Sequence, residues 1–278
     1  MKLSILIPAY NYTEGIERIL NRAKELKYVN KKKYEIIIHD NSENFRIYNI
    51  YKKYADYLNI HYKKNLKFIG AANNWNSLLK VAKGQFIYMI HHDEFPQKKN
   101  FFSKLILTVE NYKNYDIFFF NCLLVNNNII LRQNFFFLLK KLIITYFPAY
   151  ILRRNVVGSI SNIVFKNKNI LFDKRLVWLV DVDFYYRLIK KSKKNFLFLN
   201  QENILSFYKY RNSITNKLTN EKLKKEREHK ILSNNKSYQF LKIYEIFLVS
   251  IIEKFIWFFI IFNLRFFYFL KKILYIKN

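Results

Sequence analysis

Four polar residues of metal-binding type follow directly after an apolar segment near residue 90. Residues 86–90 have the composition of a buried strand, and the next residues are His91, His92, Asp93 and Glu94. Imidazole nitrogens and carboxylate oxygens bind metal ions, and acids beyond the carboxyl end of a strand can reach a cation that bridges two phosphates. These residues therefore indicate a metal site for a phosphorylated ligand. The same pattern also fits an ordinary polar loop after a strand.

The residues around this segment predict alternating strands and helices. Apolar segments at residues 3–11 and 34–44 each end in polar, turn-forming residues. Between them an apolar stripe recurs at helical spacing, formed by Ile16, Ile19, Leu20, Ala23 and Leu26. A second helical stripe precedes Gly84 and the strand at residue 86, formed by Ala71, Ala72, Trp75, Leu78, Leu79 and Ala82. This alternation predicts an α/β fold with a parallel sheet, right-handed crossovers and an open carboxyl edge.

Three motifs in this frame resemble those of the inverting family 2 glycosyltransferases, which have the GT-A fold. The motifs are SILIPAYN at residues 4–11, HDNSEN at 39–44 and AANNWNSLLKVAKGQFIYMIHHDEF at 71–95. The resemblance covers residues 2–215. It implies a Rossmann-like, nucleotide-sugar-binding sheet that is mixed but mainly parallel and flanked by helices. It also implies a nucleotide-diphosphate sugar as donor.

The resemblance assigns donor contacts to individual positions. Ala9 and Tyr10 fall where the family's first strand lies beside the nucleotide base. Asp40 falls on the acid at the end of the second strand, which implies that it accepts a hydrogen bond from the base. Asn76 falls on the Asn of the family's donor-side helix. These four residues are therefore expected to bind the nucleotide sugar.

The resemblance also implies a metal site, in which this chain departs from the family pattern at two positions. Asp93 falls on the last Asp of a D-x-D motif, with His92 before it as a donor contact and Glu94 beside it. His91 stands where many relatives carry the first Asp, and Trp75 where many carry Arg. The expected ion, held by His91, Asp93 and Glu94, is Mg²⁺, which keeps waters and phosphate ligands, or Mn²⁺, which imidazole favours. Zinc on His91, His92 and Asp93 is less consistent, because adjacent residues on a strand end point in different directions.

Residues 162–191 form a second block that resembles the acceptor side of the family. There the first acid of a D-x-D-apolar-x-x-Arg helix acts as catalytic base, and this role carries over to Asp181. A base must remove the proton of the acceptor hydroxyl while that oxygen attacks the sugar. Asp181 and Asp183 also have a structural interpretation, because acids in a first helical turn interact favourably with the helix dipole or cap the helix. Val180 stands where relatives usually carry an acid.

A basic residue follows the predicted closing strand. Arg211 precedes the sequence Ser213-Ile214-Thr215 and resembles the family's basic residue near the diphosphate. A cation there would stabilise charge on the departing nucleotide. A solvated basic turn is an equally good interpretation in a chain so rich in Lys.

The charge of the chain is strongly positive and offers a rival class of function. The chain has 49 Lys and Arg against 20 Asp and Glu, a formal charge of +29. Such a charge is typical of nucleic-acid binding, but the basic residues are scattered, and no nucleic-acid-binding motif appears. No nucleic-acid partner is therefore expected. An anionic membrane surface, which attracts each nearby Lys or Arg by about 1 kcal/mol, fits the charge better.

The C-terminal residues also favour a membrane surface. Residues 238–276 are mostly apolar and aromatic, but charges interrupt them before any run reaches the roughly 18 apolar residues that span a bilayer. Lys254, Arg265 and Lys272 would lie on nearly one line of a helix. Such a helix either lies in the membrane interface or docks on the enzyme itself. Residues 135–152 are a second candidate, either facing the membrane or covering the acceptor pocket.

Together these patterns predict a catalytic domain at residues 1–218, with a nucleotide-sugar-binding half at 1–95 and an acceptor half at 96–218, followed by a basic, aromatic helical tail at 219–278. The predicted protein is a cytoplasmic glycosyltransferase, peripheral at the inner face of the membrane, that transfers a sugar with inversion to a glycan or lipid-linked acceptor. Bacterial surface polysaccharide or lipooligosaccharide synthesis is the context that the resemblance implies.

Two other functions remain open at the level of sequence. One is a catalytically weakened relative that binds nucleotide sugar or partner enzymes, suggested by His91, Trp75 and Val180. The other is a basic membrane or nucleic-acid adaptor.

Overall fold

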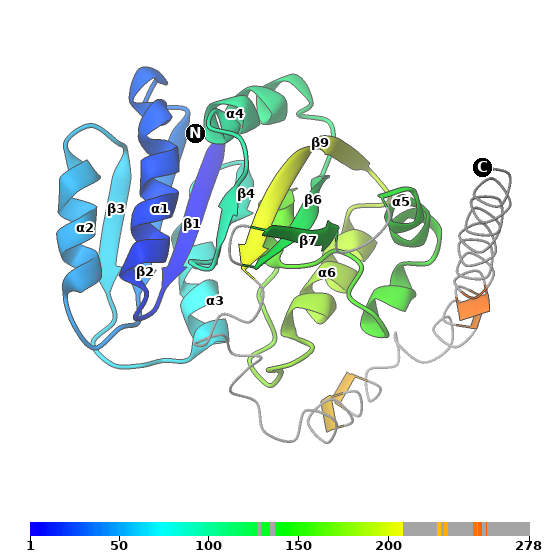
Figure 1. The fold of residues 1–278 in the computed structure, drawn as a ribbon. Helices are drawn as coiled ribbons and strands as arrows, with labels where there is room; N and C mark the ends of the chain where they lie inside the picture. Colours follow the sequence, from blue (N-terminus) through cyan, green and yellow to red (C-terminus); the bar gives the residue numbers. More distant parts are fainter. Residues whose placement is uncertain are drawn as a thin grey trace, which may run out of the picture.

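A single nine-stranded sheet organises the protein (Figure 1). The computed structural model describes residues 1–126, 129–133 and 137–207, with residues 227, 228, 231, 232, 247, 248, 250, 251 and 254. The strand order is β3-β2-β1-β4-β8-β6-β9-β5, and β7 pairs with β6. The strands are β1 (Leu3–Ala9), β2 (Tyr34–Asp40), β3 (Ile60–Lys64), β4 (Phe86–Met89), β5 (Glu94–Pro96), β6 (Ile117–Asn126), β7 (Ile129–Gln133), β8 (Ile163–Lys166) and β9 (Phe196–Phe207).

The pairing changes character along the sheet. Strands β3, β2, β1 and β4 are mutually parallel, as the β-α-β pattern predicts. Beyond β4 the sheet is mixed, because β8 runs antiparallel to both β4 and β6, whereas β9 runs parallel to β6. Parallel neighbours end at the same edge of the sheet, so the loops after β1, β2 and β4 meet there. This edge carries most of the predicted donor residues.

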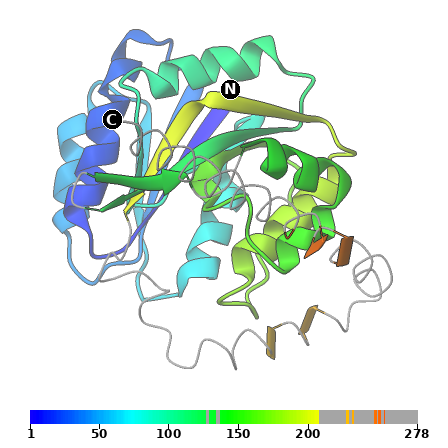
Figure 2. The ribbon, with the colours of Figure 1, turned by 45° about the vertical axis from the view of Figure 1, so that its right-hand side comes forward.

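Helices cover both faces of the sheet, and each face has its own apolar core. The helices are α1 (Thr13–Ala23), α2 (Arg46–Ala55), α3 (Ala71–Val81), α4 (Phe101–Asn111), α5 (Phe137–Tyr146) and α6 (Val180–Lys191). Short 3-10 helices are η1 (Lys24–Tyr28), η2 (Pro148–Leu152) and η3 (Ile160–Asn162). Helices α1, α2 and α4 pack on one face, and α3, α5 and α6 on the other (Figure 2).

Side-chain alternation along the strands explains this two-sided core. In β1, Leu6 points into the core under α3, while Ile5 and Ile7 point into the core under α1. All seven residues of β1 are buried, as expected for a strand covered on both faces. The predicted apolar stripes on α1 and α3 are confirmed, since both pack against the sheet.

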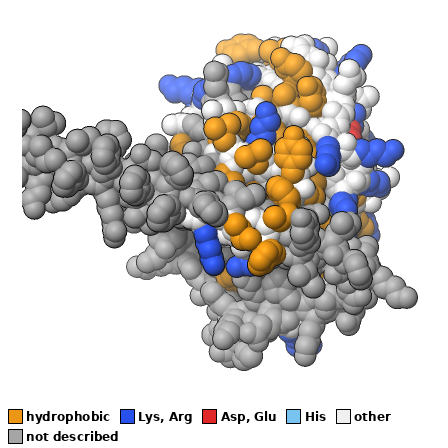
Figure 3. All heavy atoms as spheres, turned by 90° about the vertical axis from the view of Figure 1, so that its right-hand side faces the viewer, with side chains coloured by type: hydrophobic (Ala, Val, Ile, Leu, Met, Phe, Trp, Pro, Cys, Tyr) orange, Lys and Arg blue, Asp and Glu red, His pale blue; other side chains and the backbone are white. Residues whose placement is uncertain are grey.

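The α5 helix leaves one apolar stripe uncovered by the described residues. Leu138, Leu142 and Tyr146 follow one another at intervals of one helical turn and are 75%, 49% and 60% exposed. Lys141 is also exposed, and the Lys194 ammonium lies 5.6 Å from the Tyr146 ring. Figure 3 shows hydrophobic side chains interspersed with Lys and Arg on the side of the molecule where α5 lies.

Two sequence predictions fall on parts of the chain that the structure does not describe. Arg211 lies outside the described residues, and so does almost all of the predicted tail at 219–278. Among the described residues, no helix has the length and apolar character needed to cross a membrane.

Candidate active site

The loop after β4 brings three ligand-type side chains together. Ligand atoms of His91, Asp93 and Glu94 all lie within 4.8 Å of one another. The strand ends at Met89, and the chain then turns, with the Glu94 amide donating to the His91 carbonyl oxygen at 3.1 Å. This turn allows near neighbours in sequence to converge, which they could not do on a continuous strand. This group shares His91 and Asp93 with the trio that zinc would need, but it contains Glu94 instead of His92.

The imidazole of His91 could serve as a metal ligand. Its Nε2 atom is buried and has no hydrogen-bond partner among the described residues. Burial lowers the pKa of His91 to about 4, so the ring is neutral and offers a lone pair at physiological pH. A buried polar atom without a partner is costly, and coordination would satisfy it. The donor set of one imidazole and carboxylates fits Mn²⁺, and the carboxylates fit Mg²⁺.

Glu94 is held more tightly than its neighbours. Its carboxyl is 4% exposed and accepts a short hydrogen bond from the Ser161 hydroxyl, which itself accepts the His91 amide at 3.2 Å. Burial, and next the negative charge of Asp93, raises the pKa of Glu94 to about 8. Glu94 is therefore largely protonated at neutral pH, and a bound cation would have to displace that proton. Ser161 was not predicted, because it lies far along the chain and carries no local motif.

Two positions that depart from the family pattern are in direct contact. The Trp75 indole stacks on the His91 ring, with centroids 5.0 Å apart and planes 27° from parallel, and Phe172 packs edge-on against the indole at 5.0 Å. Trp75 is only 7% exposed. A neutral stacked pair thus occupies the two positions where the resemblance leads us to expect an Arg and an Asp.

Helix α1 closely approaches the loop after β4 at a glycine. A side chain at Gly15 would collide with the backbone oxygen of His92 and with the Tyr12 ring. The Tyr12 ring in turn meets the His92 ring edge-on at 5.6 Å. The absence of a side chain at Gly15 thus allows the loop to lie against α1.

The predicted base-contact residues lie together at the ends of β1 and β2. Ala9 is fully buried and its carbonyl accepts the Asn41 amide, while the Tyr10 ring packs 5.3 Å from the Phe68 ring. Asp40 is also fully buried. One of its oxygens accepts the Ser42 amide at 2.8 Å and the other accepts the Tyr62 hydroxyl at 2.7 Å, with Lys64 at 3.4 Å. Protein groups thus contact both Asp40 oxygens, and a hydrogen bond to a base remains a prediction.

Asn76 occupies a different environment from the other predicted donor residues. It is 2% exposed, its amide nitrogen donates to the Phe172 carbonyl at 2.9 Å, and its oxygen accepts the Phe172 amide at 2.8 Å. This pair of bonds ties α3 to the segment that leads to α6. The backbone of Phe172 thus binds both ends of the Asn76 side-chain amide. A direct contact of Asn76 with the donor stays a prediction.

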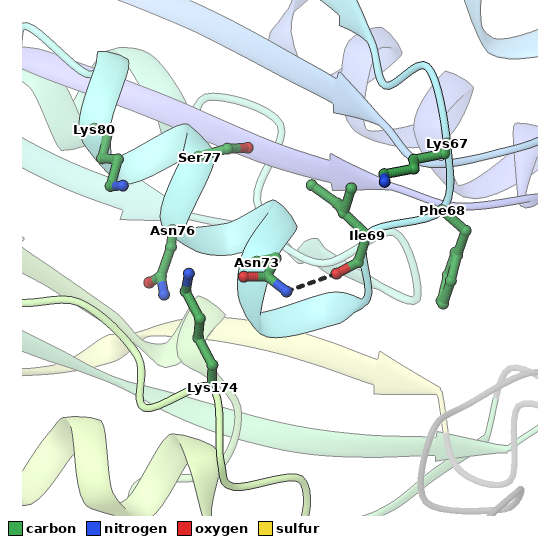
Figure 4. A pocket seen from close by; sticks show the side chains of 8 residues that line it. All are labelled: Lys67, Phe68, Ile69, Asn73, Asn76, Ser77, Lys80 and Lys174. Carbon is green, nitrogen blue, oxygen red and sulfur yellow. Dashed lines mark hydrogen bonds between the residues drawn. The ribbon is translucent and has the colours of Figure 1, made fainter.

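A cationic cavity lies along α3, next to Phe68 (Figure 4). It has a volume of about 440 Å³, and its lining residues are Lys67, Phe68, Ile69, Asn73, Asn76, Ser77, Lys80 and Lys174. Three of these eight are lysines and none is acidic, so the cavity favours an anion. Phe68 also touches Tyr10, which places the cavity beside the predicted base site.

The two acids at the start of α6 differ sharply in their environments. Asp183 is 2% exposed and accepts two bonds from the Arg187 guanidinium, at 2.6 and 2.9 Å. Asp181 has a buried Oδ1 atom with no hydrogen-bond partner among the described residues, and burial raises its pKa to about 7. A carboxylate with a free oxygen and a pKa near neutrality can accept a proton, whereas a carboxylate in an ion pair cannot do so readily.

Tyr185 on α6 is buried near two of the candidate carboxyls. This buried side chain donates to the Gly158 carbonyl at 3.1 Å. Burial raises its pKa most, and the nearby carboxyls of Asp181 and Glu94 raise it further. Both acids therefore lie close enough to act on one phenol. The structure brings the predicted base to the same region as the predicted metal ligands.

Comparison with known proteins identifies the class. The topology is that of the GT-A glycosyltransferases, as the sequence predicts. The family model "Glycosyl transferase family 2" matches residues 4–178, more than half of the chain. The chain therefore belongs to this family. No curated protein matches the chain.

Several solved structures share the fold at low sequence identity. TarS from S. aureus, residues 1–349 with UDP-GlcNAc, is 18% identical with a TM-score of 0.61, over 79% of this chain and 62% of that one. A longer TarS structure is 20% identical with a TM-score of 0.59, over 75% and 37%. Mannosyltransferase PcManGT from Pyrobaculum calidifontis, with GDP-Man and Mn²⁺, is 12% identical with a TM-score of 0.55, over 74% and 56%. The chain thus spans 37% to 62% of the length of these relatives.

The contact between Trp75 and His91 predicts that substitutions at the two positions are coupled. Trp75→Arg buries a guanidinium without a partner and should lower the free energy of unfolding by about 3 kcal/mol. His91→Asp should also destabilise the protein, because it places a carboxylate against an indole. The double variant forms an ion pair and should recover at least about 1 kcal/mol relative to the sum of the single variants. Urea denaturation of the four proteins measures this coupling; additivity within about 0.3 kcal/mol would contradict it.

Proposed function

We propose that this protein transfers a sugar from a nucleotide-diphosphate donor to a glycan or lipid-linked acceptor, with inversion at the anomeric carbon. The observation that carries the proposal is the pairing of two groups in one region of a GT-A fold. One is the ligand cluster after β4, and the other is Asp181 with its free oxygen and raised pKa. Family membership supports the reaction type.

In the proposed reaction, Asp181 accepts the proton of the acceptor hydroxyl while the hydroxyl oxygen attacks the anomeric carbon. The bond from that carbon to the diphosphate oxygen breaks on the opposite face, and the nucleoside diphosphate leaves with the bonding electrons. One displacement inverts the stereochemistry. A Mg²⁺ or Mn²⁺ ion held by Asp93 and His91, with Glu94 beside them, would neutralise charge on the leaving diphosphate.

The donor is proposed to lie along the edge formed by β1, β2 and β4. Ala9, Tyr10 and Asp40 would contact the base, and Asp93 with His92 would lie near the diphosphate. The cationic cavity beside Phe68 supports binding of phosphate charge at this edge. Structures of TarS with UDP-GlcNAc and of PcManGT with GDP-Man show that proteins of this fold take such donors.

The proposed acceptor and setting are a bacterial surface polysaccharide or lipooligosaccharide, built at the cytoplasmic face of the membrane. The exposed stripe Leu138, Leu142 and Tyr146 on α5, bordered by Lys141, supports this location. Apolar side chains next to cations suit the interface of an anionic bilayer. We also propose a donor half at 1–95, an acceptor half at 96–218 and a membrane-associating tail at 219–278, the beginning of which packs on the core under α6 through Leu232.

Donor binding is the first experiment. Calorimetry with UDP, GDP, CDP and dTDP, each with Mg²⁺ or Mn²⁺, should find one diphosphate that binds only with the metal. Asp93→Ala should weaken that binding at least about tenfold, because it removes the carboxylate ligand. Asp56→Ala, which changes an exposed acid just after α2, should bind as the wild type does. A folded wild type that binds none of the four would exclude the active transferase and favour the adaptor.

Asp181→Asn should abolish transfer while leaving donor affinity unchanged. The expected loss in kcat is about 10²–10⁴-fold, the usual contribution of a general base. Since the raised pKa keeps the carboxyl protonated below about 7, wild-type kcat should rise with pH through that value. Asp183→Asn is the matched control. It changes the other acid of the same helical turn and breaks its ion pair with Arg187, but kcat should still rise with pH through about 7, which is the acid limb of the profile. An acid limb that survives in Asp181→Asn would assign the base elsewhere.

Membrane binding should depend on the α5 stripe. In co-sedimentation with anionic phosphatidylglycerol vesicles, Leu138→Ser with Leu142→Ser should lower the partition coefficient about tenfold or more, because two apolar side chains no longer enter the interface. The control is Leu66→Ser with Leu107→Ser, two exposed leucines elsewhere. Equal binding by both double variants would show that α5 does not face the membrane.

A further inference from the structure

A buried carboxylate from far along the chain binds the backbone at the start of α6. Glu228 is 5% exposed, and its two oxygens accept three successive backbone amides. The Val177 amide donates at 2.9 Å, the Trp178 amide at 3.0 and 3.1 Å, and the Leu179 amide at 2.7 Å. Successive amides that converge on one anion form a backbone nest. The contact is therefore a built feature of the fold rather than a surface encounter.

Helix α6 has no cap of its own. Leu179 at its N-cap position cannot accept an amide hydrogen bond through its side chain, and no side-chain cap bond is present. A carboxylate at this end of the helix interacts favourably with the helix dipole and satisfies amides that precede the first turn. Glu228 thus takes the place of a local cap.

Glu228 is itself anchored in the core. Leu232, which is 4% exposed, belongs to the apolar core under α6, and Ile231 packs against the same core. These contacts fix the segment that carries Glu228 against the core.

Asp181 lies two residues after the last amide that Glu228 binds. Its Oδ1 atom has no hydrogen-bond partner among the described residues, so hydrogen bonds to that atom do not orient the carboxylate. Its position depends on the backbone of the first helical turn and on packing. A group that fixes that backbone therefore limits where the carboxylate can lie.

We propose that Glu228 is a positioning residue for Asp181, an inference that rests on the proposed function. Glu228 holds residues 177–179 so that the first turn of α6 presents the base to the acceptor hydroxyl. Its carboxylate is bound to three backbone amides, so its role is indirect. Its loss should therefore slow the chemical step without changing how the donor binds.

A second glutamate offers a matched control. Glu25 accepts the Phe102 amide at 2.8 Å, the Ser103 amide at 3.2 Å and the Ser103 hydroxyl at 2.8 Å, at the start of α4. Helix α4 carries none of the proposed site residues. Glu25→Gln removes the same kind of contact at a helix start and reports the effect of lost stability alone.

Steady-state transfer kinetics test the proposal with the full-length protein. Glu228→Gln should lower kcat at least about tenfold, since a small misplacement of a catalytic group is costly, and leave the donor KM unchanged. Glu228→Asp, which keeps the charge, should recover part of kcat. Glu25→Gln should change neither constant. Equal losses of kcat in Glu228→Gln and Glu25→Gln, or a rise in donor KM that accounts for the loss, would overturn the proposal.

Amide hydrogen exchange separates this inference from the proposed function. Peptides that cover residues 176–183 should exchange faster in Glu228→Gln than in the wild type or Glu25→Gln. Unchanged exchange would overturn the positioning role whatever the activity. A wild type without transfer activity would refute the proposed function, and the positioning of Asp181 as a base would fall with it, while faster exchange would still confirm that Glu228 holds the start of α6.

Discussion

The parallel pairing of β1 with β2 and β4 is the constraint on which the site depends. Because the three strands run the same way, their polar ends meet at one edge of the sheet. The strands are buried, and their pairing fixes where each of them ends relative to its neighbours. The ligand cluster after β4 and the aromatic pair of Tyr10 and Phe68 follow from this arrangement.

Burial of ionisable groups is the second theme of this structure. Glu94 and Asp181 have raised pKa values, and burial lowers the pKa of the Lys140 ammonium to about 8 while it donates to the carbonyls of Phe120 and Val157. Charges in an apolar interior are costly unless they are satisfied. Glu94 and Lys140 are satisfied by hydrogen bonds to nearby protein groups, whereas Asp181 retains a free oxygen, which distinguishes a candidate base from structural ionisable groups.

The sequence predicted those parts of the site that follow from local pattern. Apolar segments predicted β1, β2 and β4, helical periodicity predicted α1 and α3, and the polar strand ends predicted that the candidate donor residues lie at one edge of the sheet. The predicted strand ended at Ile90, one residue beyond β4; the Ile90 amide still donates to the Leu6 carbonyl of β1 at 2.9 Å, and the chain turns after it. The His91 amide and the Glu94 carboxyl in that turn both bind the Ser161 hydroxyl, some 70 residues away in the chain. Sequence periodicity cannot predict such a distant contact. The contact between Trp75 and His91 is likewise tertiary, so two apparent departures from the family pattern did not look related.

Some elements lacked a sequence signal of their own. Strand β3 alternates buried and exposed residues only briefly, and it is specified by its pairing with β2. The resemblance assigned the base to Asp181, while Asp181 and Asp183 both also suited a structural role in a first helical turn. The ion pair between Asp183 and Arg187 makes the environments of the two acids different, which local pattern could not show. Glu228 could not be predicted because its partners are backbone amides some 50 residues away.

The most direct test of the account is a crystal structure of the protein with Mn²⁺ and the nucleoside diphosphate that binds it, with manganese located by anomalous scattering. The account predicts one manganese peak at the loop after β4, about 2.1 Å from an Asp93 oxygen and within bonding distance of His91 Nε2, with the diphosphate completing its coordination. A nucleotide bound at the edge of β1, β2 and β4 without manganese at Asp93, or manganese bound elsewhere with the nucleotide, would contradict it.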